Sequence, residues 1–231
     1  MSTNKPISIA IDGPVSAGKS TLSEALARHL GILHLDTGAM YRAIALYALD
    51  NGIDPMDEIA LNTIIEQELA RVAVQYVNQF QKTMLNGVNI TSRLREEPVG
   101  AAASAVSRYP AVRRYLVGLQ QQLAQQQSLL IDGRDIGTVV LPDADIKIFL
   151  TATPEARALR RYTQLISSGQ WADYPTVLAD LIKRDAQDTG REHDPLRAAE
   201  DAVVLDTSSL SFEESLEKLI RLVEAHHAKK P

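Results

Sequence analysis

Residues 7–26 of this chain read ISIAIDGPVSAGKSTLSEAL, and this stretch decides the fold. The apolar run at residues 7–11 is rich in isoleucine and stops at Asp12-Gly13, which is typical of a buried parallel strand. From residue 20 to residue 30, leucines and alanines recur at helical spacing until Gly31 provides a C-terminal stop. The stretch therefore predicts a strand, a loop and a helix in direct succession.

The loop between this strand and this helix fits the pattern G-x-x-x-x-G-K-[ST] through Gly13, Gly18, Lys19 and Ser20. Glycines let the backbone curl until successive N–H groups point inward, and the following helix presents its positive N-terminus to the same place. In this geometry a lysine reaches the β- and γ-phosphates of a nucleotide, and a serine hydroxyl ligates Mg²⁺. A chance match is the alternative, but the strand and the helix on either side disfavour it. The loop therefore predicts a phosphate-binding site.

The same alternation of apolar runs and helical patterns continues along the chain. Further apolar runs lie at residues 32–35, 129–131, 146–150 and 203–205. Because helical stretches separate these runs, we expect an α/β fold with a five-stranded parallel sheet covered on both faces.

Two segments depart from this alternation. Apolar residues that alternate at 72–76 and an Asn-Gly pair at 86–87 predict a small antiparallel β insertion at about residues 71–95. A break in a helical stretch, SSGQW, fits a mobile lid at about residues 155–174 and fits a plain turn between two helices equally well. We expect a single unit, whose core comprises about residues 1–70, 96–154 and 175–231.

Composition excludes several classes of protein. Hydrophobic residues make up 45% of the 231 residues and charged residues 23%, so wholesale disorder is not expected. The net charge of -5 argues against nucleic acid as the main partner, and the absence of cysteine excludes disulfides and thiolate metal sites. The first residues, MSTNKP, lack the apolar core of a signal peptide, and no run approaches the length of a membrane span. We expect a cytoplasmic protein that binds neither membranes nor nucleic acid.

Three more clusters carry charged residues, and each also has a purely structural interpretation. DTGAMYR at residues 36–42, taken alone, is more simply a helix cap followed by a surface arginine. IDGRD at residues 131–135 follows a predicted strand, where open α/β sheets bind ligands, and fits a functional role and a structural role equally well. KRDAQDTGR at residues 183–191 has the alternating charges of a solvated helix face.

Five arginines are the right residue type for a phosphoryl-transfer site, because a guanidinium binds phosphate oxygens through two parallel hydrogen bonds. They are Arg42, Arg113, Arg134, Arg184 and Arg191. Their spacing does not say whether they converge.

Taken together, these clusters resemble the bacterial cytidylate kinase family of nucleoside monophosphate kinases. The matching segments, in order, are IAIDGPVSAGKST, LDTGAMYR, AAASAVSRYPAVR, IDGRDIGTVV, PDADIKIFL, KRDAQDTGR and VVLDTSSLS. The resemblance spans nearly the whole chain. It implies a P-loop kinase fold like that of adenylate kinase, in which the β insertion binds the monophosphate and the helical break is a lid.

The resemblance also implies the site residues. The ATP-binding set is Gly13, Pro14, Val15, Ser16, Ala17, Gly18, Lys19, Ser20 and Thr21, with Mg²⁺ at Ser20 partly through water. The acceptor set is Asp36, Thr37, Tyr41, Arg42, Ser104, Arg113, Arg134, Asp135, Arg184, Asp188 and Arg191. Within the acceptor set, Arg42, Arg134 and Arg191 match phosphate-binding residues. Ser104, Arg113 and Asp135 match the residues that read cytosine, while Arg184 and Asp188 match residues near the ribose hydroxyls. The catalytic set is Lys19, Arg134, Arg191 and Asp132.

The reaction that the resemblance implies is transfer of the γ-phosphoryl group of Mg-ATP to CMP, with dCMP as a second acceptor, by a monomer. A kinase for UMP, dTMP or shikimate is one alternative, and a P-loop switch or motor ATPase is another. A switch would need a guanine-reading N-K-x-D, and a motor a predicted strand that ends in Asp-Glu. The sequence has neither.

Overall fold

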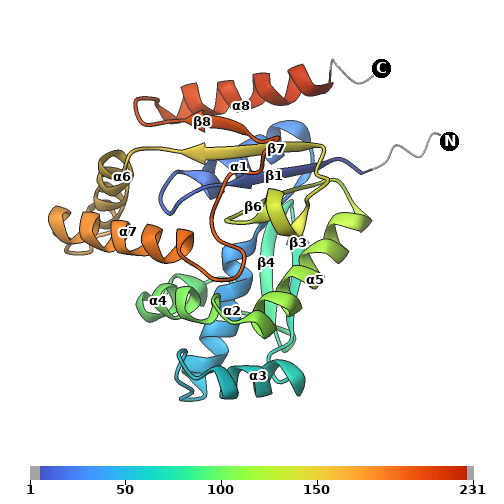
Figure 1. Cartoon of the computed structure of the whole chain (residues 1–231), viewed down its shortest axis with the longest axis vertical. Coiled ribbons are helices and arrows are strands. Elements are labelled where there is room, and N and C mark those ends of the chain that lie inside the picture. The colour runs from blue at the N-terminus through green and yellow to red at the C-terminus, as the bar shows by residue number, and fades with distance from the viewer. Residues whose placement is uncertain (1–5, 228–231) are drawn as a thin grey trace.

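A five-stranded parallel sheet forms the centre of the molecule in the computed structural model, which describes residues 6–227 (Figure 1). The strand order is β2-β6-β1-β7-β8, and every neighbouring pair is parallel. This confirms the predicted sheet, strand by strand; the expectation about a signal peptide concerns residues that lie largely outside the described range. The strands are β1 (Ser8–Asp12), β2 (Leu33–Asp36), β6 (Leu129–Gly133), β7 (Ile146–Thr151) and β8 (Val203–Asp206).

The sheet separates two apolar cores, which explains why its strands are continuous apolar runs. In β1, Ile9 and Ile11 belong to one core, whereas Ala10 between them belongs to the other. One core is covered by α1 (Lys19–Leu30) and α8 (Phe212–His227), whose buried residues both belong to it. The other core contains residues of the second group of helices: α2 (Thr37–Asp50), α3 (Glu58–Glu66), α4 (Glu97–Val106) and α5 (Pro110–Gln126).

The predicted β insertion is a three-stranded antiparallel sheet, made of β3 (Val72–Val77), β4 (Phe80–Leu85) and β5 (Val88–Asn89). The Asn86-Gly87 turn joins β4 to β5 with positive φ at both residues, as the sequence predicts. This small sheet docks on the parallel sheet through β4, where the side chain of Gln81 accepts from the backbone N–H of Asp36 at 2.8 Å.

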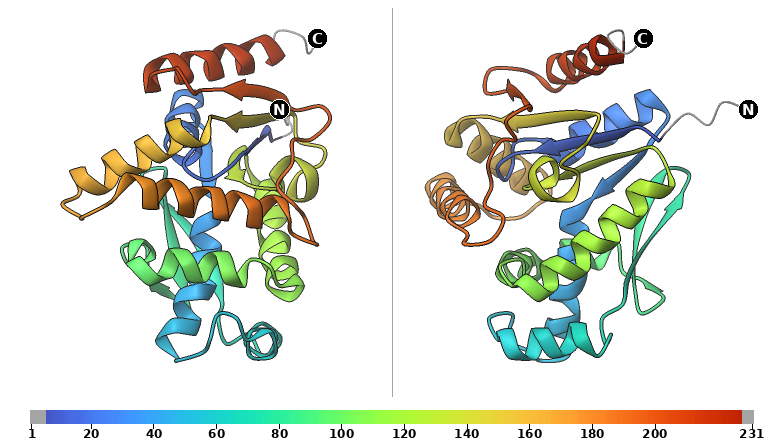
Figure 2. Two further views of the ribbon diagram at one scale, coloured as in Figure 1. Left: turned by 60° about the vertical axis from the view of Figure 1, so that its left-hand side comes forward. Right: turned by 45° about the vertical axis from the view of Figure 1, so that its right-hand side comes forward.

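Two long helices, α6 (Pro154–Ser167) and α7 (Tyr174–Thr189), run side by side on the flank of the molecule (Figure 2). Residues 168–173 connect them, so the break in the helical pattern lies where the sequence predicts it. The chain then returns from α7 to β8 through residues 190–202, which we call the return segment. Within residues 6–227, no helix combines the length and the apolar character needed to cross a bilayer.

Candidate active site

The loop after β1 has a backbone that two of its glycines make possible. Gly13 has φ of +151°, and a Cβ placed on it would lie 1.9 Å from the backbone oxygen of Leu150 in β7. Gly18, with φ of +88°, directly precedes the first turn of α1. The loop therefore curls tightly between β1 and α1, in the conformation that the sequence pattern predicts.

Lys19 is buried within this loop. Only 6% of the residue is exposed, and its Nζ donates to the backbone oxygen of Pro14 at 2.7 Å, across the turn of the loop. Burial holds the pKa of Lys19 well below its usual value, and the nearby charge of Arg134 acts in the same direction. An anion next to Lys19 would oppose both effects, so the ammonium group is placed where a phosphate would stabilise it.

Asp132, at the end of β6, connects the loop to β2. Its Oδ2 accepts from the hydroxyl of Ser20 at 2.9 Å, and its Oδ1 lies 2.6 Å from Nε2 of His34. Burial raises the pKa of Asp132, but the hydrogen bond and charge of His34, together with Lys19, outweigh burial and lower it overall. Asp132 therefore stays ionised beside the hydroxyl of Ser20.

Asp12 is a second buried carboxylate at this edge of the sheet, and we did not predict it as a site residue. Its two oxygens accept from the backbone N–H groups of Ile136 and Gly137, both at 2.7 Å. These N–H groups begin a π-helical turn, η2 (Ile136–Val140), a rare element that is frequent at functional sites. Burial raises the pKa of Asp12 to about 6. Asp12 thus fixes the chain after β6 against the start of the loop.

Three arginines, Arg134, Arg184 and Arg191, act on the carboxylate of Asp188 in α7, and the charge of Arg42 reaches Arg184. Oδ2 of Asp188 accepts from Nε of Arg134 at 2.8 Å and its Oδ1 accepts from Nη2 of Arg191, and its side chain is 2% exposed. Nε of Arg184 is buried and has no hydrogen-bond partner among residues 6–227. Burial, and then the charge of Arg134, lower the pKa of Arg184 to about 10, with Arg42 acting in the same direction. The arginine cluster (Arg42, Arg134, Arg184 and Arg191) therefore holds more positive charge than Asp188 neutralises.

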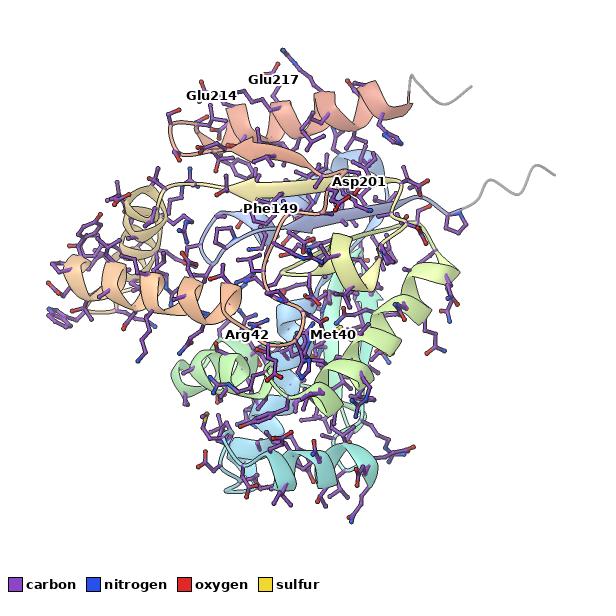
Figure 3. All side chains as sticks on the ribbon, viewed as in Figure 1. Met40, Arg42, Phe149, Asp201, Glu214 and Glu217 are labelled. Atoms are coloured by element: carbon purple, nitrogen blue, oxygen red, sulfur yellow. The ribbon has the colours of Figure 1, made fainter. Side chains whose placement is uncertain are left out.

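Arg42 lies in the first half of α2 and is partly exposed. Figure 3 shows it near the middle of the molecule, between the parallel sheet and α4. The expected helix cap is present as well, because Oδ1 of Asp36 accepts from the N–H of Ala39 at 3.2 Å. Arg42 lies 3.7 Å from the other oxygen of Asp36, and its side chain is 35% exposed. The cap expected from the structural interpretation of this motif is thus present at Asp36, while Arg42 is neither fully exposed nor buried.

Arg113, from α5, is the centre of a third group. Its Nη2 donates to Asp135, its Nε donates to Asp194 at 2.7 Å, and its Nη1 donates to the backbone oxygen of Ser107 at 3.4 Å. The ring of Tyr41 lies 6.0 Å from this guanidinium. The structure thus brings together Arg113, Asp135 and Tyr41 from the predicted set.

Two further predicted residues, Ser104 and Thr37, contact these groups through backbone atoms. Ser104 is connected to Arg113 through Ser107, whose hydroxyl donates to the backbone oxygen of Ser104 at 2.9 Å. Thr37 donates its hydroxyl to the backbone oxygen of Asp132 at 2.8 Å, which ties the start of α2 to the end of β6.

Sequence reasoning missed four residues that contact this site, namely Asp12, His34, Arg157 and Asp194. Asp12 ends a predicted parallel strand and His34 shares a strand face with Asp36, so position alone would have indicated both. No local signal marks the other two. Arg157 in α6 donates to the backbone oxygen of Val15 in the loop at 3.1 Å and pairs with Asp185 of α7 at 2.7 Å.

A parallel sheet of this order, a glycine-dependent loop around a buried lysine and a facing arginine cluster define a P-loop kinase. The model of the cytidylate kinase family matches residues 9–225. Cytidylate kinase of Caldicellulosiruptor bescii is 48% identical over 94% of this chain and 96% of its own, and that of Mycobacterium leprae is 47% identical over 94% and 95%. The fold is shared with an uncharacterized protein from Eubacterium ventriosum, at 15% identity and a TM-score of 0.53 over 96% of this chain and 99% of that one. This chain belongs to the cytidylate kinase family. It is therefore a phosphotransferase, which implies ATP as the phosphate donor and a nucleotide as substrate.

Proposed function

We propose that this enzyme transfers the γ-phosphoryl group of Mg-ATP to CMP, and also to dCMP, giving ADP and CDP or dCDP. The observation that carries the proposal is the arginine cluster, which faces the phosphate-binding loop with one buried Nε of Arg184 unpaired. A buried excess of guanidinium charge is costly unless an anion neutralises it. A second phosphate, separate from those of ATP, would do so, and the second phosphate belongs to the acceptor nucleotide.

On the donor side, residues 13–21 bind the phosphates of ATP, with Lys19 close to the group that is transferred. Oγ of Ser20 and Oδ2 of Asp132 lie 2.9 Å apart and are the hard oxygen donors that would hold Mg²⁺, directly or through water. No group of three or more His, Cys, Asp or Glu within residues 6–227 is arranged to hold a metal. This suits an ion that takes its other ligands from phosphate and water, and that neutralises phosphate charge when bound.

On the acceptor side, Arg42, Arg134 and Arg191 bind the phosphate of CMP, with Thr37 beside them. Arg113 has five N–H groups, of which three are used in the hydrogen bonds described above. The remaining two N–H groups match the neighbouring O2 and N3 acceptors of cytosine, and Asp135 accepts from the exocyclic amine, with Ser104 and Tyr41 beside them. Uracil presents an N–H at position 3 instead of an acceptor, which gives a reason for discrimination.

The ribose lies near Arg184 and Asp188. Both oxygens of Asp188 are engaged by arginines, so its main effect is to hold Arg134 and Arg191 in place. The ribose contact therefore falls mainly to Arg184.

The chemical step needs no general base, because the phosphate of CMP is already an anion at neutral pH. The barrier comes from repulsion between two polyanions and from their alignment, which Lys19 and the arginines lower by neutralisation and positioning. A single arginine that stabilises the transferred group is worth about 10³ to 10⁵ in rate. Loss of Arg134 or Arg191 should therefore be severe.

We further propose that residues 71–95 form the monophosphate-binding insertion and that residues 155–174 form a lid. The contacts of Arg157 support the lid, because they connect α6 both to the loop and to α7. A closed lid excludes water from the site. This prevents water from hydrolysing the γ-phosphoryl group. The monomeric state, the cytoplasmic location and the lack of nucleic-acid binding stay predictions.

The acceptor is tested by measuring ADP release with Mg-ATP and CMP, dCMP, UMP, dTMP or AMP supplied separately. We expect kcat/KM to be highest for CMP and dCMP, since only cytosine presents two adjacent acceptors and an amine to Arg113 and Asp135. Equal kcat/KM for CMP, dTMP and AMP would refute the cytosine assignment of these residues.

The donor site is tested by Lys19→Ala. We expect kcat to fall at least about 10²-fold, because a preorganised charge is removed from the transferred phosphate, while the circular dichroism spectrum is unchanged. Lys218→Ala, at an exposed position of α8, is the matched control and should keep its activity. Normal turnover in the Lys19 variant would remove the loop from the mechanism.

A further inference from the structure

The base-reading arginine of the proposed function is itself held between two carboxylates, and one of them comes from the return segment. Asp194 lies in this segment and reaches Nε of Arg113 at 2.7 Å, while Asp135 binds Nη2. The side chain of Arg113 is 4% exposed and that of Asp194 is 32% exposed. The arginine is therefore buried, and the carboxylate that binds it is partly exposed to solvent. A guanidinium bound at Nε and at Nη2 is fixed in both position and rotation.

The backbone at Asp194 is strained in the conformation that places its carboxylate next to Arg113. Its φ is +51°, in the left-handed region that residues other than glycine rarely adopt. Asp tolerates this region better than most residues, and here the strained backbone turns a carboxylate toward Arg113. Residues 191–193, which line an open cavity together with Glu58, Arg108, Tyr109 and Pro110, directly precede Asp194.

We propose that Asp194 is a positioning residue for acceptor binding, which holds Arg113 in the orientation that contacts the base of CMP. This inference rests on the proposed function, in which Arg113 binds the base of CMP. Asp194 uses up the Nε–H of Arg113 and leaves the two unused N–H groups at the outer end of the guanidinium. Without Asp194, the guanidinium keeps one carboxylate partner and can rotate about it, so the two free N–H groups lose their fixed direction.

The same pair ties the return segment to α5. Arg191, which binds Asp188, lies three residues before Asp194 on that segment. A displaced return segment would therefore weaken the phosphate contact, whereas a freed Arg113 would weaken the base contact alone. These two effects can be separated by a ligand that has the phosphate and the sugar but no base.

The experiment compares Asp194→Gly, Asp194→Asn and the wild-type enzyme. Glycine removes the carboxylate and accepts the left-handed backbone without strain, and asparagine keeps a carbonyl acceptor and also tolerates this backbone. The matched control is Asp201→Asn, which breaks another ion pair of the return segment, that with Lys147 at 2.9 Å. Figure 3 shows Asp201 beside the sheet, well apart from Arg42.

We expect KM for CMP to rise about tenfold in Asp194→Gly, as for a lost hydrogen bond to a charged group, with kcat changed less than about threefold. Asp194→Asn should recover part of the loss, and Asp201→Asn should match the wild type. The dissociation constant of CMP from calorimetry should follow KM, while inhibition by ribose 5-phosphate should be unchanged.

Two results would overturn the inference. One is a KM for CMP in Asp194→Gly within twofold of that in Asp201→Asn. The other is equal weakening of CMP and ribose 5-phosphate, which would mean that the return segment and not Arg113 is disturbed. If Asp194→Gly does not fold, the asparagine variant alone decides, since an unchanged KM in it together with unchanged CMP affinity refutes the inference. Failure of the proposed function is distinct, because the wild-type enzyme would then not prefer CMP at all.

Discussion

His34 lies outside the phosphate-binding loop but contacts a carboxylate that is hydrogen-bonded to the loop. Its ring contacts Asp132, which in turn accepts from the hydroxyl of Ser20, and its backbone oxygen accepts from the hydroxyl of Tyr76 in the β insertion at 3.1 Å. Burial alone would lower the pKa of His34, but the hydrogen bond and charge of Asp132 outweigh burial and raise it. The folded protein therefore favours the imidazolium form next to the ionised carboxylate.

This pairing predicts how stability depends on pH. A histidine whose pKa is raised by folding stabilises the folded state fully below its unfolded pKa, near 6.5, and this stabilisation is lost as pH rises through the folded value. We expect His34→Gln to lower the free energy of unfolding by about 1.5–3 kcal/mol at pH 6, with a smaller difference at pH 9. Urea unfolding at several pH values measures this.

The control for His34→Gln is His29→Gln, at an exposed position in the last turn of α1, which should change stability by no more than about 0.5 kcal/mol at any pH. A destabilisation by His34→Gln that is the same at pH 6 and pH 9 would show that the histidine is neutral throughout, and would contradict the charge pairing with Asp132.

At the scale of elements, the junction of β1, the loop and β7 is the tightest contact in the molecule that a glycine makes possible. A Cβ on Gly13 would lie 1.9 Å from the backbone oxygen of Leu150, and backbone cannot move aside as a flexible side chain can. We expect Gly13→Ala to destabilise the protein by about 3 kcal/mol or more, since overpacking and strained φ add, and to abolish activity. Thermal unfolding and the ADP-release assay measure the two effects.

Gly31→Ala provides the comparison for Gly13→Ala. Gly31 also has positive φ, +67°, but no atom of the part of the chain that the structure describes lies within 4 Å of a Cβ placed there. The cost should therefore be the backbone strain alone, about 1 kcal/mol, with activity kept. Equal destabilisation by the two substitutions would show that the close approach to β7 adds nothing to the cost at Gly13.

The elements were predictable to different degrees, for identifiable reasons. β1 and β6, in the middle of the parallel sheet, are buried on both faces, so each is an apolar run that is visible in the sequence. The edge strand β8 is an apolar run as well, although Val203 and Val204 are exposed. The turn between β3 and β4 is formed by Asn78 and Gln79, both with positive φ, and contains no glycine to mark it. The π-helical turn η2 was not predictable, because its first N–H groups bind Asp12, 124 and 125 residues away in the chain.

At the scale of the whole molecule, the site gathers residues from both ends of the chain at one edge of the sheet. The conformation of the loop after β1 is encoded in one local pattern and was predictable from it. The arginine cluster comes from α2, α7 and the ends of β6 and α7, so residue type indicated its members, but only the fold brings them together. Asp194 had no local signal, because its contact with Arg113 joins residues that are 81 positions apart in the chain.

Arg184 provides a test of whether the arginine cluster favours ligand binding and destabilises the free enzyme. Among the described residues, its buried Nε has no hydrogen-bond partner, and three other arginines act on its charge, so we expect it to destabilise the free protein. We expect Arg184→Met to raise the melting temperature of the free enzyme by about 2–4 °C, as for a gain of about 1 kcal/mol in a protein of this size. Saturating CMP at about 100 times its dissociation constant should stabilise the wild-type enzyme by about 2.7 kcal/mol, or roughly 5–10 °C. At the same CMP concentration the variant should show less than half of this rise, because CMP binds it more weakly.

Arg114→Met, at an exposed position of α5, is the control and should leave both melting temperatures unchanged. If Arg184→Met lowers the melting temperature of the free enzyme and keeps the full rise with CMP, Arg184 stabilises the fold and the cluster is not a built anion site.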